Sequence, residues 1–115
     1  MARQPRQAAP QSAAAVARTA HLQASGQKQI AGTVIYSRFI SCLGLTPDVD
    51  LTQPLTSILG GGLNNWDLGL DLMSYGPFKQ DGLILQKSDV MTEVTIGGLC
   101  NLVFAWYKSD GWTVT

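Results

Sequence analysis

Apolar and polar positions alternate most regularly between residues 66 and 72, where every second residue is large and apolar. The apolar set comprises Trp66, Leu68, Leu70 and Leu72. The positions between them are Asp67, Gly69 and Asp71. A period of two is typical of a strand with one buried face, and the other face would here be acidic and solvated. A helix would place Asp67 beside Asp71 but would spread the leucines around its circumference, so we expect a strand.

The end of the chain predicts consecutive strands that fold back on one another. Asp110-Gly111 matches a two-residue type I′ turn, because both central positions of that turn require positive φ. It would join a long strand at 99–108 to a return strand at 112–115, and Gly97-Gly98 would join the long strand to 90–96. The long strand is apolar on both faces, whereas a hairpin in a lone sandwich needs only one apolar face. We therefore expect a second layer, or another protein, to cover the other face.

Turn-forming residues separate further segments that favour β structure. Residues 30–43 predict an interior strand, either bulged or ending in a helical turn, and residues 83–87 predict a short strand after a second turn at Asp81-Gly82. Residues 51–59 fit either a short helix that begins near Pro54 or an irregular edge segment. Strands at intervals of about 8–12 residues predict an all-β fold over residues 29–115, either a small antiparallel sandwich or an open barrel.

Residues 1–28 predict an extended arm that contains at most a short helix. This stretch is rich in alanine and glutamine, and Ser12 could cap a helix over residues 13–23. The apolar face of that helix would be too thin to fold alone, so we expect the arm to gain structure when it docks. The first 47 residues hold five basic residues and no acid, and the rest of the chain holds three basic and eight acidic residues. The charges of about +5 and −5 indicate a basic arm with a role of its own, unless an alanine- and glutamine-rich segment simply lacks acids.

No motif for catalysis is present in the sequence. The single histidine, His21, lies in the arm, where nothing rigid would orient it as a base for a nucleophile. Asp67 and Asp71 follow the pattern of a solvated face rather than that of an acid–base pair. Asp48 and Asp50 lack the glycine and glutamate of an EF-hand and are explained as turn residues. We therefore expect a protein without enzymatic activity.

Cofactors, metals and membranes are not expected either. Cys42 and Cys100 lie in apolar surroundings and read as buried free thiols, although a disulfide between them stays open. Two cysteines and one histidine do not make a zinc site. No stretch is long and apolar enough to predict a transmembrane helix.

Composition points to a subunit that is packed in an assembly. Charged residues make up 14% of the chain, against about 25% in typical soluble domains. Aromatic residues anchor interfaces, and basic arms pair with carboxylates of neighbours. The candidate interface residues are Arg3, Arg6, Val16, Arg18, Leu22, Tyr107, Trp112 and Val114. Contact of the arm with nucleic acid is the alternative, but no aromatic residue interleaves with its first arginines to stack on bases.

A polar basic arm followed by a compact, charge-poor β domain resembles the layout of small accessory proteins of tailed-phage virions. These include capsid cement or decoration proteins, head–tail adaptors and attachment domains of fibres. The resemblance implies a virion protein that cements or decorates a capsid as a homo-oligomer, with a trimer favoured. A tail, neck or fibre component anchored by its arm is the first alternative, and a nucleic-acid-binding module is the second.

Overall fold

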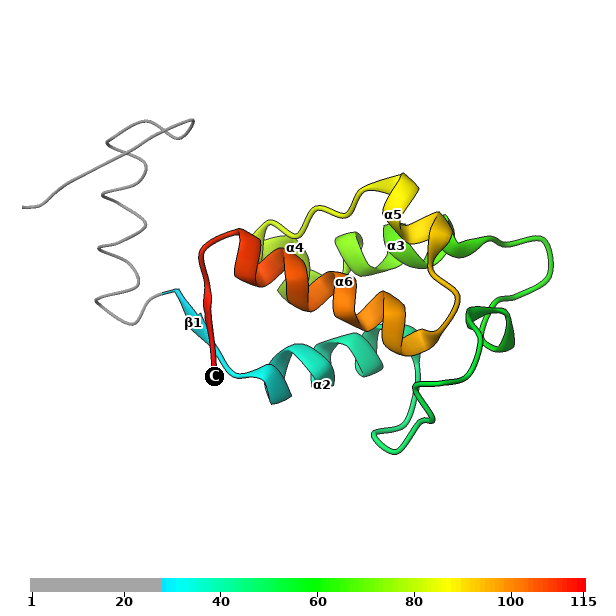
Figure 1. Ribbon diagram of the computed structural model, residues 1–115, viewed down its shortest axis with the longest axis horizontal. Coiled ribbons are helices and arrows are strands. Elements are labelled where there is room, and N and C mark those ends of the chain that lie inside the picture. The colour runs from blue at the N-terminus through cyan, green and yellow to red at the C-terminus, as the bar shows by residue number, and fades with distance from the viewer. Residues whose placement is uncertain (1–27) are drawn as a thin grey trace, which may run out of the picture.

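The protein is built mainly from helices in the part that the computed structural model describes, residues 28–115 (Figure 1). The elements are, in chain order, strand β1 (Gln29–Ile30), helix α2 (Gly32–Leu43), the 3-10 helix η1 (Leu55–Ser57), helices α3 (Asn65–Ser74), α4 (Gly76–Asp81), α5 (Lys87–Thr92) and α6 (Ile96–Ser109), and strand β2 (Thr113–Val114). The prediction of an all-β sandwich or barrel over residues 29–115 is therefore wrong. The arm at residues 1–27 lies outside the described residues.

Helix α3 replaces the strand that the alternation over residues 66–72 predicted. Asn64 begins the helix with a capping box, since its Oδ1 accepts from the Trp66 amide at 3.0 Å and Asp67 Oδ2 accepts from the Asn64 amide at 2.8 Å. Leu68 and Leu72, four residues apart, are buried on one face, whereas Leu70 is 44% exposed. The cap and this i, i+4 pair outweigh an alternation that is only seven residues long.

Helix α6 replaces the long strand expected over residues 99–108 and the Gly97-Gly98 turn, while the strand expected over residues 90–96 is replaced by the end of α5 and the connection to α6. Thr95 caps the helix, and its Oγ1 accepts from the Gly98 amide at 3.0 Å. The buried residues recur at spacings of three and four and form one stripe: Ile96, Leu99, Cys100, Val103 and Tyr107. The two apolar faces seen in a period of two are thus the core stripe and the flanks of a single helix.

Both Asp-Gly pairs end helices instead of forming hairpin turns. After α6, Gly111 has φ 90°, its amide donates to Lys108 O at 3.1 Å, and the Trp112 amide donates to Tyr107 O at 3.0 Å. Gly82 ends α4 with the same pair of hydrogen bonds, to Lys79 and Phe78. This pairing is the Schellman motif, which needs positive φ as a type I′ turn does. Positive φ is therefore found at the glycine of each pair, but Asp110 has φ −80°, so the expectation of a type I′ turn with positive φ at both Asp110 and Gly111 is wrong.

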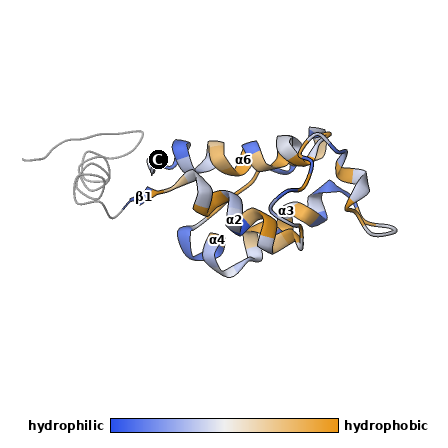
Figure 2. Ribbon diagram, turned by 90° about the horizontal axis from the view of Figure 1, so that it is seen from below, coloured by the Kyte–Doolittle hydropathy of each residue, from blue (hydrophilic) through white to orange (hydrophobic). Residues whose placement is uncertain are grey.

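The helices surround one core, to which every helix contributes at least one buried side chain. Helices α2 and α6 run in opposite directions across the molecule, and α3 packs against α2, α4 and α5 (Figure 1). Apolar residues gather on the inward faces of the helices (Figure 2). Gly69 lets α3 lie close to α5, since an added Cβ there would lie 3.4 Å from Val90 Cγ1.

The two short strands hold the ends of the described chain together. β1 and β2 pair in parallel, with Gln29 opposite Thr113 and Ile30 opposite Val114. This differs from the antiparallel hairpins that the sequence predicted. Lys28 adds an ion pair of 3.2 Å to Asp110. The point where the arm leaves the domain is therefore fixed beside the end of α6.

The long connection between α2 and α3 is tied to the start of α6 by backbone hydrogen bonds. The Leu55 amide donates to Val94 O at 2.8 Å, the Ile96 amide to Gln53 O at 3.0 Å, and the Gly97 amide to Leu51 O at 2.8 Å. Of the alternatives for residues 51–59, the structure has a single 3-10 turn at Leu55–Ser57. None of the helices between residues 28 and 115 combines the length and apolar character needed to cross a bilayer.

Candidate apolar groove between α2 and α6

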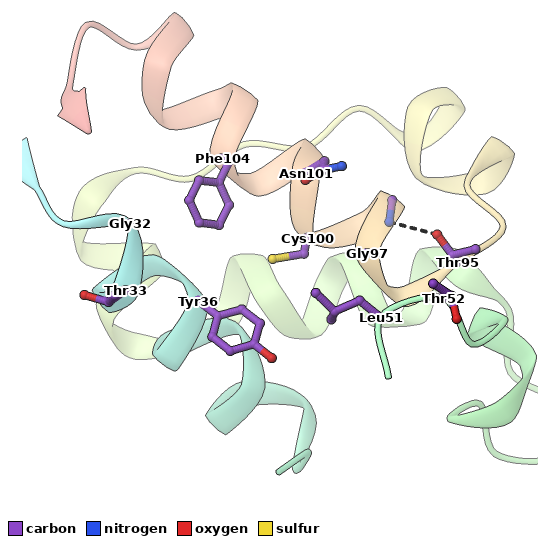
Figure 3. Close-up of a pocket in the computed structure, with 11 residues that line it drawn as sticks. Gly32, Thr33, Tyr36, Leu51, Thr52, Thr95, Gly97, Cys100, Asn101 and Phe104 are labelled. Carbon is purple, nitrogen blue, oxygen red and sulfur yellow. Dashed lines mark hydrogen bonds between the residues drawn. The ribbon is translucent and has the colours of Figure 1, made fainter. Parts of the chain in front are cut away.

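An open groove of about 690 Å³ lies between α2 and α6. Its lining comes from both helices and from the connection before η1: Gly32, Thr33, Tyr36, Leu51, Thr52, Thr95, Gly97, Gly98, Cys100, Asn101 and Phe104. Tyr36, Leu51, Cys100 and Phe104 frame the space between the two helices (Figure 3). A volume of this size is within the range of small-ligand and peptide-anchor sites.

The two long walls follow from helical spacing. On α6, Gly97, Asn101 and Phe104 lie four and three residues apart and so share one side of the helix. On α2, Gly32 and Tyr36 are four residues apart. At Gly32 an added Cβ would lie 3.3 Å from Phe104 Cε2, so this glycine lets the two helices approach closely at one end of the groove.

The other end of the groove is closed by the connection that is tied to α6. Thr52 lines the groove there and binds the Asp50 carboxylate through its amide at 2.9 Å and its hydroxyl at 2.6 Å. These two hydrogen bonds lower the pKa of Asp50, so this exposed carboxylate is ionised at neutral pH. The Glu93 carboxylate lies against Gly98, because an added Cβ there would overlap with it. Two acids thus flank the end formed by residues 51, 52, 97 and 98.

The lining itself offers binding surface rather than proton-transfer chemistry. Among the described residues that form the groove, none is histidine and none carries a charge. Burial raises the pKa of the Cys100 thiol to about 11, so it is protonated at neutral pH and is a poor nucleophile. The Tyr36 hydroxyl already donates to Pro47 O at 2.9 Å. The groove is therefore suited to bind an apolar, uncharged ligand or peptide segment.

Of the interface residues predicted from the sequence, three lie in the described part. Tyr107 is fully buried in the core, so its side chain is withdrawn from any partner. Trp112 is half-buried, with its ring 5.3 Å from that of Tyr107 and 5.8 Å from Lys28 Nζ. Val114 is half-buried in β2. Arg3, Arg6, Val16, Arg18 and Leu22 lie outside the described residues.

Cysteines and acids form no centre for a metal in the described chain. Cys42 and Cys100 are free, so the disulfide left open by the sequence is not formed. Across residues 28–115, no group of three or more histidine, cysteine or acidic side chains could hold a metal ion.

One wall of the groove has a signal in the sequence, which is visible only when residues 96–109 are taken as a helix. Small and apolar residues at Gly97, Cys100 and Phe104 repeat at a helical spacing, but the strand interpretation places Gly97 in a turn and only Cys100 and Phe104 together on one face. The contribution of Leu51 and Thr52 depends on long-range backbone hydrogen bonds to α6, which have no local signature.

Comparison with known proteins adds no relative: no protein-family model, no curated protein and no solved structure matches the chain.

Proposed function

We propose that this protein is a non-enzymatic structural subunit that assembles with copies of itself, and that the groove between α2 and α6 is the receiving surface of that contact. The observation that carries the proposal is an apolar groove with no charged side chain in its lining. Such a groove gains free energy by excluding water from an apolar segment of another chain, and helix-in-groove contacts are a common mode of recognition.

The distribution of charge supports contact between copies. Residues 28–115 contain five basic and eight acidic residues, a net charge of −3, and residues 1–27 contain three arginines and no acid, a net charge of +3. Parts of opposite charge in one chain attract each other when copies meet end to end. The net negative charge of residues 28–115 disfavours contact with nucleic-acid phosphates, so only the arm could support the nucleic-acid alternative.

Self-assembly is retained in this proposal, but the resemblance to small proteins of tailed-phage virions no longer supports it. That resemblance required a β domain beside the arm, and the described domain is helical. A place in a virion, a role as cement or fibre attachment, and trimeric symmetry therefore have no support beyond the arm.

Sedimentation equilibrium of the full chain over a range of concentrations tests the proposal. Wild type should give a mass that is a multiple of one chain. Phe104→Asp places a charge in the groove and should weaken association by at least tenfold. Asn101→Arg should do the same from the exposed rim, where the substitution does not disturb the core.

Two matched controls separate the groove from a general effect of charge. Ile84→Asp adds the same charge as Phe104→Asp on a side chain that is 62% exposed and away from the groove. Gln80→Arg matches Asn101→Arg on the exposed surface of α4. Both controls should associate as wild type does. A wild type that stays a single chain at all concentrations contradicts the proposal.

A further inference from the structure

We propose that the segment which fills the groove is residues 12–23 from the arm of a second copy, so that the contact is head-to-tail. The inference rests on the proposed function, since it names the partner of the same groove. In such a contact, the arm of one chain meets the groove of the next, and the two surfaces are different.

The direction of β1 favours a neighbour over the same chain. Strand β1 runs toward α2, whose first residue, Gly32, already lines the groove. Lys28 is held at this exit because its carbonyl accepts from the Thr113 amide at 2.9 Å and its Nζ lies 3.2 Å from Asp110 Oδ2. Lys28 lies at the end of the molecule where both strands lie (Figure 1), so a segment of the same chain would have to reverse the direction of β1 to enter the groove.

The sequence of the arm matches the chemistry of the groove. The predicted helix over residues 13–23 would carry Val16 and Ala20 on one face, four residues apart. A short alanine-rich helix is thin, and it is marginal in water until its apolar face is buried. The walls of the groove are mainly apolar and carry no charge, so an alanine-rich helix would meet surface of its own kind.

The charges of the arm segment and of the closed end of the groove are opposite in sign. Arg18 is the single charged residue between positions 7 and 27. Asp50 and Glu93 flank the end of the groove that is remote from Gly32, and Asp50 is ionised. If residues 12–23 lie along the groove, Arg18, the one cation among them, can reach these carboxylates while alanine, valine and leucine meet the uncharged walls.

The experiment uses full-length chains with one surface changed at a time. Val16→Asp/Ala20→Asp places two charges on the apolar face of the arm and should reduce self-association at least tenfold in sedimentation velocity. Gln4→Asp/Ala8→Asp adds the same two charges, also four residues apart, in the part of the arm that precedes residues 12–23. This control should associate as wild type does.

Mixing two defective chains distinguishes a head-to-tail contact from the alternatives. Val16→Asp/Ala20→Asp has an intact groove, and Asn101→Arg has an intact arm. Each alone should remain a single chain, and an equimolar mixture should form a complex of two chains that grows no further, because its remaining arm and groove are both defective. Circular dichroism of each chain confirms that the helices are intact.

The possible results separate this inference from the proposed function. Assembly that is unchanged by Val16→Asp/Ala20→Asp overturns the inference and leaves the groove as a contact for another surface. A wild type that remains a single chain overturns both. A mixture that stays as single chains overturns the head-to-tail contact, because that mixture contains one intact arm and one intact groove on different chains.

Discussion

The hydroxyl of Tyr107 in α6 donates a hydrogen bond of 2.6 Å to Asp81 Oδ2 at the end of α4. Arg38 of α2 completes the cluster, since its Nη1 donates to Asp81 Oδ2 at 2.8 Å and to the Tyr107 oxygen at 3.1 Å. Burial, and after it the Asp81 carboxylate, raise the pKa of Tyr107, so the phenol stays protonated and keeps donating. Three helices are thus joined through one carboxylate at the edge of the core.

Tyr107→Phe should lower the free energy of unfolding by about 1–2 kcal/mol, because it removes a hydrogen bond to a charged acceptor while keeping the buried ring. Tyr36→Phe is the matched control. It removes a hydroxyl that bonds a carbonyl at an exposed position, so its loss should be smaller. Urea denaturation of both variants and wild type measures the difference, and equal losses would show that the Asp81 contact adds nothing.

Gly82→Ala should lower the free energy of unfolding by about 1–2 kcal/mol, since an L-residue with a side chain is strained at positive φ. The φ of Gly82 is 85°, and an added Cβ would meet nothing within 4 Å, so backbone strain is the whole expected effect. Gly61→Ala is the control, because its Cβ would also meet nothing. It should cost no stability, and a loss at Gly61 as large as at Gly82 would contradict the Schellman assignment.

Asn64→Ala should cost about 1 kcal/mol of stability, because it removes the side chain that accepts from the first amides of α3. The loss should appear as a lower urea midpoint with an unchanged slope. Asn101→Ala is the control at an exposed position within a helix, and it should change stability by less than about 0.5 kcal/mol.

Some local patterns in the sequence fit two different structural motifs, and the prediction was wrong where this was so. Chain reversals were expected at Asp81-Gly82 and Asp110-Gly111, and the chain does change direction there, but a Schellman motif and a type I′ turn both need positive φ. The prediction of the fold class was wrong at residues 66–72 because the alternation of apolar and polar residues there fits both a strand and a helix. An alternation of seven residues is too short to exclude a helix, and the capping box formed by Asn64 and Asp67 is a helix-start signal that the sequence contains.

The groove could be predicted less well than the helices. Its α6 wall has a helical repeat that the sequence contains, but Leu51 and Thr52 reach it through hydrogen bonds between distant parts of the backbone. Tyr107 shows the opposite error. An aromatic residue near the end of a chain was assigned to an interface, whereas the stripe that begins at Ile96 carries it into the core. Burial of a side chain depends on which residues share its face, and that requires the correct period.

The stability of the protein should fall as the pH rises from about 9 to about 11. Burial raises the pKa of Cys100 to about 11, and burial together with the nearby Asp71 carboxylate does the same for Cys42, from an ordinary value near 9. The unfolded chain therefore loses these protons before the folded chain does, which favours unfolding over this range and has no effect below it.

Other groups titrate in the same range, so the comparison must be made with variants. The fall in unfolding free energy between pH 8.5 and pH 10.5 should be smaller in Cys100→Ala and in Cys42→Ala than in wild type, measured by urea denaturation with a reducing agent. A fall of the same size in all three proteins would mean that the folded chain ionises these thiols as readily as the unfolded chain does.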